Sequence, residues 1–290
     1  MRKTYKVAGH LFAIVMADDA DGWNNMANFE PFLVDDSGGC LFEIELVDAL
    51  PDTSDKEKVT WSCNAPNEPR YEFYKWRGLL LMETAPTYDA PICVHMISEN
   101  NFSKVQFQID AYWKFSFNLI IEMVFAIATA KLYTLQIHSS VIMKDGKGYL
   151  FLGQSGTGKS THSQLWINNI EGCSLLNDDN PIIRIGEDGI ARVYGSPWSG
   201  KTPCYRNLNV PIGAIVSLRQ AKENVIKRLS VSEAYAVIYM SFTGLKFIKE
   251  FGDAHHATNL KLVNTVPFYR LECLPNADAA FLCYNTVSQQ

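Results

Sequence analysis

The glycine-rich stretch Gly153-Gln-Ser-Gly-Thr-Gly-Lys-Ser-Thr161 constrains the fold of this chain more than any other feature. Gly153, Gly158, Lys159 and Ser160 have the spacing GxxxxGK(S/T), the pattern of a phosphate-binding P-loop. Glycines let the backbone curl tightly, so that successive amide N–H groups can face one anion. This stretch therefore predicts a loop that wraps around a polyphosphate.

The segments on both sides of the loop have the required character. Residues 149–152 form an apolar run that predicts a buried strand, and residues 162–170 can continue as a helix. Strand, glycine loop and helix in this order are the context in which the pattern becomes a P-loop. The start of the helix adds unsatisfied N–H donors and the positive end of the helix dipole.

The P-loop interpretation gives each part of the loop a role. We expect Lys159 to reach the outer phosphates and the Ser160 hydroxyl to ligate a magnesium ion. The expected ligands of the loop are therefore a polyphosphate and Mg²⁺. The expected nucleotide-binding residues are Gly153, Gln154, Ser155, Gly156, Thr157, Gly158, Lys159, Ser160 and Thr161.

Two carboxylates follow the P-loop closely. Residues 174–176 predict a short strand that runs into Asn177-Asp-Asp-Asn180. Acidic residues at the end of a strand soon after a P-loop are typical of a second magnesium-binding element. One carboxylate can hold the metal while the other removes a proton from an incoming hydroxyl. We therefore expect Ser160, Asp178 and Asp179 to be metal ligands, and a solvated turn is the alternative.

A polar loop further along the chain could close over the substrate. Residues 195–206 include Lys201 and Arg206, which suit a mobile loop over phosphate, whereas Trp198 could instead anchor that loop. The next predicted strand ends at Arg219, from which a guanidinium group could meet a transferring phosphoryl group. A plain surface arginine is the competing interpretation.

Length and composition fit a globular protein of one large or two modest domains. The chain has 290 residues, of which 47% are hydrophobic and 20% charged. The formal net charge of -5 disfavours nucleic acid or an anionic membrane as the main partner. Seven scattered cysteines without a CxxC spacing predict neither a disulfide framework nor a zinc site, and they fit reduced thiols in the cytoplasm.

Two apolar segments imitate targeting or membrane signals. Residues 7–17 follow a basic start, but Gly9 and His10 interrupt the apolar run, so we expect a first strand there. Residues 115–132 contain charged side chains and are too short and polar for a membrane span, so we expect a buried helix. The expected protein is cytoplasmic, with no membrane segment.

The first 110 residues predict a β-rich domain without a catalytic constellation. Aromatic and β-branched runs alternate with polar turns, which is typical of a mainly antiparallel sheet. The acidic cluster at 18–22 fails the spacing of a calcium-binding EF-hand loop and predicts a solvated turn. The expected strands are 11–16, 40–47, 58–62, 71–83, 92–97 and 104–109.

Residues 111–290 predict the P-loop domain, with helices toward its end. The expected fold class is therefore mixed α/β or α+β. The neighbouring residues His255 and His256 are expected on a helix surface, without metal partners at suitable spacing. The expected helices are 111–131, 162–170, 232–243, 245–263 and 277–286, and the expected strands are 135–143, 149–152, 174–176, 182–185, 190–194, 210–218 and 269–273.

Three motifs together resemble the kinase domain of HPr kinase/phosphorylase, a family that shares its core with phosphoenolpyruvate carboxykinases. The motifs are Ile137-His-Ser-Ser140, the P-loop and Leu176-Asn-Asp-Asp-Asn180. The C-terminal part, with Val210-Pro-Ile-Gly-Ala-Ile-Val216, looks like the shorter HPr-kinase-related proteins of bacteria.

The resemblance implies a β-rich P-loop core, ATP or another phosphate donor, magnesium at Ser160 and a role for His138 near the phosphates. It makes Asp179 the candidate general base, with Asp178 assisting the metal or water. The residues expected to carry catalysis are Asp179, Lys159, His138 and Arg219.

The leading hypothesis is a magnesium-dependent kinase that passes a phosphoryl group from ATP to a hydroxyl of a protein serine or a small molecule. A nucleotide-binding sensor or scaffold is the second hypothesis, favoured by the absence of a glutamate from residues 195–201, where the related enzymes have one. A carboxykinase-like enzyme that holds a small carboxylic acid with Lys201, Arg206 and Arg219 is the third. No base-reading NKxD motif of a regulatory GTPase follows the P-loop. The sequence leaves a homo-oligomer open.

Overall fold

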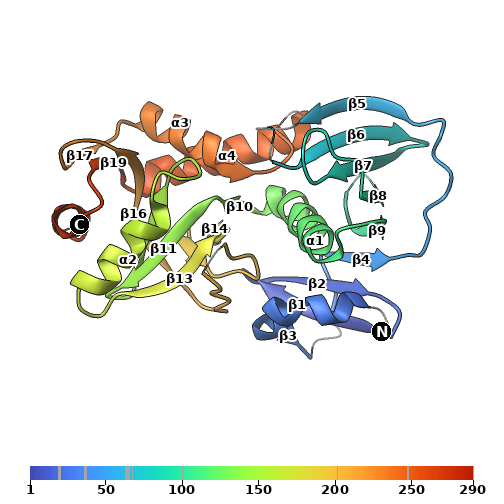
Figure 1. Cartoon of the computed structure of the whole chain (residues 1–290), viewed down its shortest axis with the longest axis horizontal. Helices are drawn as coiled ribbons and strands as arrows, with labels where there is room; N and C mark the ends of the chain where they lie inside the picture. The colour runs from blue at the N-terminus through green and yellow to red at the C-terminus, as the bar shows by residue number, and fades with distance from the viewer. Residues whose placement is uncertain are drawn as a thin grey trace. The chain divides into compact units, whose positions relative to one another are not determined.

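The computed structural model is a mixed α+β protein with two large sheets and few helices. It describes residues 1–18, 21–35, 38–62, 66, 68–99, 101–200, 202–246 and 248–289. By internal contacts the chain divides into two compact units, Met1–Ala128 and Thr129–Gln290 (Figure 1). The predicted acidic turn at 18–22 and the predicted loop residue Lys201 lie partly or wholly outside the described residues.

The first unit is built on one sheet of nine strands among its described residues. The strand order is β3-β1-β2-β4-β9-β8-β7-β6-β5, with β2, β4 and β9 parallel and the other pairs antiparallel. The strands are β1 Arg2–Val7, β2 His10–Val15, β3 Leu33–Val34, β4 Phe42–Leu46, β5 Glu57–Ser62, β6 Arg70–Trp76, β7 Leu79–Ala85, β8 Val94–Ser98 and β9 Lys104–Ile109. Two short 3-10 helices, Asp21–Asn25 and Ala27–Phe32, follow β2.

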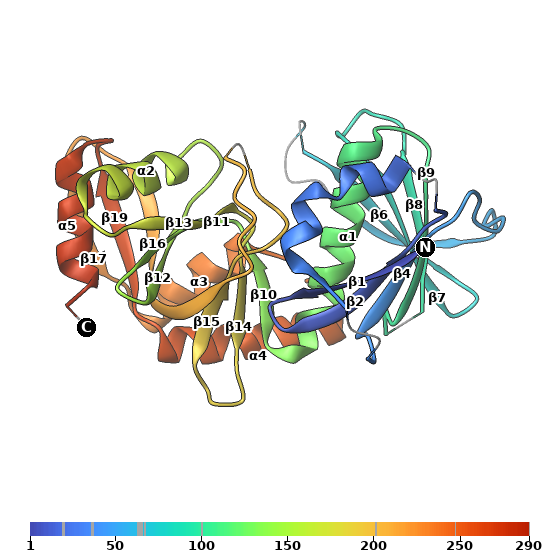
Figure 2. The same ribbon diagram turned by 90° about the horizontal axis from the view of Figure 1, so that it is seen from below.

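Helix α1 (Trp113–Thr129) belongs to the first unit because its aromatic side chains pack on that sheet. Helix α1 lies against the strands of this unit (Figure 2). Phe117 contacts Phe107 of β9, and Phe125 contacts Phe12 and Phe42 of β2 and β4. The division by contacts therefore falls between residues 128 and 129, whereas the sequence predicts a C-terminal domain that begins at residue 111 and includes this helix.

The same helix bears on the question of a membrane span. Among the described residues, one segment, Trp113–Leu132, is long and apolar enough to cross a membrane by length and composition, and 61% of its most apolar window is buried. Core helices of soluble proteins meet the same criterion, so this is weak evidence for a span. The packing of Phe117 and Phe125 instead agrees with the predicted buried helix.

Three predictions in the chain need correction. The single strand predicted over 135–143 is two strands, β10 (Thr134–Ile137) and β11 (Ser139–Lys144), which pair with different neighbours on either side of His138. The single strand predicted over 71–83 is a hairpin, because Arg77 and Gly78 both have positive φ and turn the chain between β6 and β7. The predicted surface pair is also wrong for one of its members. His255 is buried on the inner face of its helix. His256 is exposed, and its Nδ1 atom is hydrogen-bonded to the Tyr235 hydroxyl at 2.7 Å.

The second unit has ten strands among its described residues. Its main strand order is β13-β11-β12-β16-β15-β14-β10-β18, and β19 joins β16 and β17. The strands are β10 Thr134–Ile137, β11 Ser139–Lys144, β12 Lys147–Leu152, β13 Ser174–Asp179, β14 Ile182–Ile185, β15 Ala191–Tyr194, β16 Asn209–Gln220, β17 Val225–Arg228, β18 Phe242–Thr243 and β19 Phe268–Cys273. The helices are η3 Ala130–Leu132, α2 Lys159–Asn169, α3 Val231–Ser241, α4 Lys249–Thr265 and α5 Ala277–Val287.

Helices cover both faces of this second sheet (Figures 1 and 2). Alternate side chains of β12 separate the two cores: Tyr149 and Phe151 pack with α2 and α5, and Leu150 and Leu152 pack with α3 and α4. Strand β16 joins the parts of the sheet. Its first residues pair antiparallel with β15, and its later residues pair parallel with β12 and β19. The carboxyl ends of β12, β16 and β19 therefore meet at one edge, where the glycine loop begins.

Candidate functional site

The glycine loop leaves the sheet from a central, buried strand. Strand β12 pairs with β11 on one side and with β16 on the other, and its last residues are fully buried. Helix α2 begins at Lys159, directly after the loop. The order of strand, loop and helix thus matches the sequence expectation for residues 149–170.

Two glycines in the loop adopt a backbone conformation that other residues rarely take. Gly156 has a φ of 82° and Gly158, the N-cap of α2, has a φ of 100°. A Cβ atom on Gly156 would meet nothing within 4 Å, and one on Gly158 would meet only Thr161 Cβ at 3.9 Å. Backbone conformation, and not crowding, therefore demands glycine at both positions.

The loop is held by hydrogen bonds at its base and at its tip. The backbone N–H and the hydroxyl of Thr157 both donate to the Gln154 carbonyl, at 3.1 and 2.7 Å. The Gln220 side chain, at the end of β16, donates to the Gly156 carbonyl at 3.2 Å. The tip of the loop is therefore tied to the strand that runs beside β12.

Helix α2 is fixed to the sheet by buried contacts. Trp166 is fully buried and donates from Nε1 to His162 Nε2 at 3.1 Å, and the Ser163 and Ser140 hydroxyls are 2.6 Å apart. Burial lowers the pKa of His162 to about 4. The first intrahelical bond runs from His162 N to Gly158 O, so the preceding amides of the helix have no acceptor within it.

The Lys159 ammonium lies at the base of the loop. Its Nζ atom is 3.0 Å from the Gly153 carbonyl oxygen and 2.8 Å from His138 Nε2. Burial lowers the pKa of Lys159, and the charges of Asp179 and Asp178 oppose that shift. The ammonium therefore sits half-buried near two carboxylates, where an anion would gain more from it than in open water.

His138 joins Lys159 to Asp179. Its other ring nitrogen, Nδ1, is 2.9 Å from Asp179 Oδ1. An ammonium group can only donate, so Nε2 accepts from Lys159, and the proton of the neutral ring lies on Nδ1 and is donated to Asp179. The arrangement sets both the tautomer and the orientation of His138. The backbone N–H of His138 donates to the Ser241 carbonyl at 2.8 Å.

Asp178 approaches the first turn of α2 from β13. The Ser160 hydroxyl donates to Asp178 Oδ1 at 2.9 Å, and Asp178 is buried. The two acidic residues therefore face different partners: Asp178 contacts the serine after the P-loop lysine, and Asp179 contacts His138. The family resemblance already gives the two acids different roles, Asp178 with the metal or water and Asp179 as the base, and the two roles stay a prediction. The sequence does not reveal that Asp179 contacts His138.

Asp179 has an unusual backbone conformation. Its φ is 143°, in a region that a residue with a Cβ atom adopts only when its surroundings enforce it. The residue is the last of β13, where it pairs with Ser139 of β11 and forms a bridge with Ser199. Strain of this kind clusters at functional sites, which makes Asp179 a candidate for a chemical role.

The pair Ser160 and Asp178 fits a small divalent cation. Two adjacent oxygen ligands about 2.1 Å from Mg²⁺ lie about 3.0 Å apart. The Ser160 and Asp178 oxygens are 2.9 Å apart. Among the described residues no group of three or more His, Cys, Asp or Glu side chains could hold a metal. A cation here would therefore take its remaining ligands from phosphates and water, as Mg²⁺ commonly does.

The loop 195–206 is anchored to β13. Trp198 is buried, which agrees with the anchoring alternative for that residue, and Arg206 donates from Nη1 to the Leu175 carbonyl at 2.6 Å. Because its guanidinium group donates to a backbone carbonyl, Arg206 is a weaker candidate for binding the substrate. Asn177 and Ser196, to which the sequence gives no role of their own, bind this loop to the segment that carries the acidic pair.

Arg219 lies near the loop without joining the contacts described above. Arg219 is exposed. Its two neighbours in sequence both lie next to the glycine loop. The Leu218 carbonyl oxygen would be 3.4 Å from a Cβ atom on Gly153, and Gln220 contacts Gly156. Among the described residues, then, Lys159, His138 and Asp179 form one connected group. Ser160 and Asp178 form a second contact between the residues next to Lys159 and Asp179 in sequence, and Arg219 lies beside the loop outside both.

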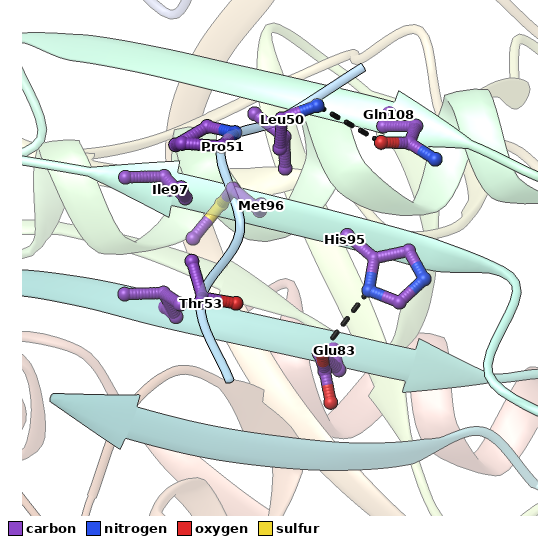
Figure 3. Close-up of a pocket in the computed structure, with 9 residues that line it drawn as sticks. Leu50, Pro51, Thr53, Glu83, His95, Met96, Ile97 and Gln108 are labelled. Atoms are coloured by element: carbon purple, nitrogen blue, oxygen red, sulfur yellow. Dashed lines mark hydrogen bonds and ion pairs between the residues drawn. The ribbon is translucent and has the colours of Figure 1, made fainter. Parts of the chain in front are cut away.

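A separate cavity of about 120 Å³ lies in the first unit (Figure 3). The segment at Leu50, Pro51 and Thr53 passes over the polar face of the sheet there. His95 bridges two carboxylates, with Nδ1 3.0 Å from Glu83 and Nε2 3.0 Å from Asp110. Lys56 also contacts Glu83. The charged groups in this cavity are therefore paired with one another.

Comparisons with known proteins do not assign a family to this chain. No protein-family description matches the chain, and no curated protein matches its sequence. A solved structure of the Hpr(Ser) kinase/phosphatase from Coxiella burnetii is similar over 53% of this chain and 93% of its own, with 12% identity and a TM-score of 0.31. A TM-score this low does not establish a shared fold, so the function must be argued from the side chains.

Proposed function

We propose that this chain is a magnesium-dependent, ATP-binding phosphotransferase that passes a phosphoryl group to a hydroxyl acceptor. One observation carries the proposal: the connected group of Lys159, His138 and Asp179 lies at the base of the glycine loop, beside the contact of Ser160 with Asp178. A phosphate-binding loop, a metal-binding oxygen pair and a proton acceptor are the parts that phosphoryl transfer needs.

The residues divide the chemistry among them. The amides of the glycine loop and the Lys159 ammonium bind the phosphates and stabilise the charge that develops on them. Ser160 and Asp178 would hold Mg²⁺, which neutralises charge on the outer phosphates when bound. His138 keeps Asp179 oriented by donating from Nδ1. The hydrogen bond between Lys159 and His138 breaks when the Lys159 ammonium group turns toward a phosphate.

The transfer itself follows from these positions. The acceptor hydroxyl oxygen forms a bond to the terminal phosphorus while the bond from that phosphorus to the bridging oxygen breaks, and ADP leaves with the electron pair. The hydroxyl proton passes to an Asp179 carboxylate oxygen. Positioning and electrostatic stabilisation contribute most of the acceleration in such reactions. We place the reaction in the cytoplasm, where ATP is available.

The proposal is tested by separating nucleotide binding from turnover. Calorimetry with ATP and Mg²⁺ measures binding, and ADP formation with water and a panel of hydroxyl compounds measures transfer. Asp179→Asn should reduce ADP formation by about 10²- to 10⁴-fold, because a positioned base contributes that much, while ATP affinity stays nearly unchanged. Asp188→Asn is the matched control, since Asp188 is an exposed acid paired with Arg192.

Two results would contradict the proposal. Equal loss of binding and of ADP formation in Asp179→Asn would show that this residue holds the nucleotide and does not act as the base. Tight ATP binding by the unaltered protein, without ADP formation from any acceptor, would instead support the nucleotide sensor.

A further inference from the structure

Asn177 precedes the acidic pair on β13 and is fully buried. Its side-chain nitrogen lies 3.1 Å from the Trp198 carbonyl oxygen, 3.4 Å from the Ser196 carbonyl oxygen and 3.2 Å from Ser196 Oγ. Carbonyl oxygens only accept, so the amide nitrogen must be the atom that faces them. Asn177 therefore holds the loop 195–206 from inside the sheet.

Ser196 extends this contact to the other side of the acidic pair. Its hydroxyl donates to the Asn180 carbonyl at 2.6 Å, and it accepts from the Trp198 N–H at 3.2 Å. Ser196 is fully buried. Residues 177 and 180, which flank the two aspartates, are thus both bound to the same short segment, 196–200, which we call the brace.

The brace also contacts the aspartates directly. The Gly200 N–H donates to the Asp178 carbonyl at 2.5 Å, and the Ser199 hydroxyl donates to the same carbonyl at 3.2 Å. Ser199 forms a β-bridge with Asp179. A Cβ atom on Gly200 would lie 3.1 Å from both the Asp178 carbonyl oxygen and the Asp179 Cβ atom. The brace therefore fits closely against the backbone of both acids.

This close fit accounts for the strained backbone at Asp179. A residue with a φ of 143° keeps that conformation only when its surroundings fix it from several sides. On one side Asp179 pairs with Ser139, and on the other the brace closes against it. Loosening the brace would let Asp179 relax and would move Asp178 away from Ser160.

We propose that Asn177, acting through the brace, is a positioning residue that holds Asp178 and Asp179 in the arrangement that binds the metal–nucleotide complex. The inference rests on the proposed function and adds a residue to it. The side-chain contacts of Asn177 are with Ser196 and Trp198 of the brace, so its effect on the site would pass through that segment. Partners of this kind orient metal ligands, and their loss typically weakens metal affinity about 10- to 100-fold.

The test compares ATP affinity with Mg²⁺ and with EDTA, measured by calorimetry on the full chain. The difference between the two is the metal-dependent part of binding. Asn177→Ala should keep the affinity in EDTA and lose about 10- to 100-fold of the Mg²⁺-dependent gain. Asn224→Ala is the matched control, because Asn224 also makes two side-chain hydrogen bonds in the second unit, to Asn276 and Leu274.

A second variant keeps the test decisive if Asn177→Ala fails to fold. Gly200 is exposed, so Gly200→Ala removes no buried hydrogen bond, yet its methyl group would press on both aspartates. It should reduce the Mg²⁺-dependent gain in the same way and leave the affinity in EDTA unchanged.

The outcomes separate the inference from the function on which it rests. A full Mg²⁺-dependent gain in either variant overturns the inference, as does an equal loss of affinity with and without metal, which a merely structural role would produce. If the unaltered protein shows no Mg²⁺-dependent gain at all, the proposed function fails and this inference fails with it.

Discussion

Gly158→Ala offers a prediction whose size can be worked out from one backbone angle. Gly158 has φ 100° and ψ 25°, a left-handed conformation that costs a residue with a Cβ atom about 1–2 kcal/mol. The nearest atom to the added methyl group would be Thr161 Cβ at 3.9 Å, so crowding adds nothing to that cost. The whole effect of the substitution is therefore the strain energy of one residue.

The strain must appear in one of two measurements. If the loop keeps its shape in the variant, the free energy of unfolding falls by about 1–2 kcal/mol and ATP affinity is unchanged. If the free loop relaxes, stability is kept, but ATP binding must restore the strained shape and weakens by about 5- to 30-fold, at 1.4 kcal/mol per factor of ten. In either case the two losses, expressed as free energies, add up to about 1–2 kcal/mol.

Urea unfolding and calorimetry with ATP measure the two losses on the same protein. Gly189→Ala is the control, since Gly189 also has a positive φ, of 76°, and a Cβ atom there would meet nothing within 4 Å. It should lose stability and keep ATP affinity. The reasoning is refuted if Gly158→Ala changes neither quantity, or if Gly189→Ala weakens ATP binding as much as Gly158→Ala does.

Three further predictions concern the same unit. Lys159→Met should weaken ATP binding at least about tenfold, because a charge-assisted contact to phosphate contributes more than a neutral one, and calorimetry that shows unchanged affinity would contradict this. Burial holds the pKa of His162 and of His255 at about 4, below the ~6.5 of the unfolded chain, so the folded protein prefers neutral rings. Stability should therefore be fully present above pH ~6.5 and fall as the pH drops toward 4, by up to about 3 kcal/mol for each residue, and urea unfolding that is equally stable at both ends of this range would count against it. Asn276→Ala should cost about 1 kcal/mol of stability, because the Asn276 side chain caps α5 by accepting from Ala279 N–H, and it should leave ATP affinity unchanged in the same two assays.

The local order around the glycine loop could be predicted from the sequence because each signal is short-range. An apolar strand, three closely spaced glycines and a helix follow one another without long gaps, and the structure has β12, the loop and α2 in that order.

Other features depend on contacts between distant segments and left no readable signal. Arg77 is unusual in a two-residue hairpin turn, so the break between β6 and β7 was hidden in an otherwise continuous run. His255 and His256 are neighbours in sequence but lie on different faces of α4, and only the packing against Phe242 shows which one is buried. Asn177 in its acidic setting favours a turn locally, and its role depends on Ser196 and Trp198, about twenty residues away.

Strand β16 (Asn209–Gln220) runs as one continuous strand between the two sides of this centre. Its first residues hold the hairpin from which the brace departs, and its last residue holds the tip of the glycine loop. A slip of one residue in its pairing would turn every side chain to the opposite face and displace both ends at once. Substitutions that change the acceptor specificity of this protein should therefore occur around the edge of the site, while β16 itself tolerates little variation.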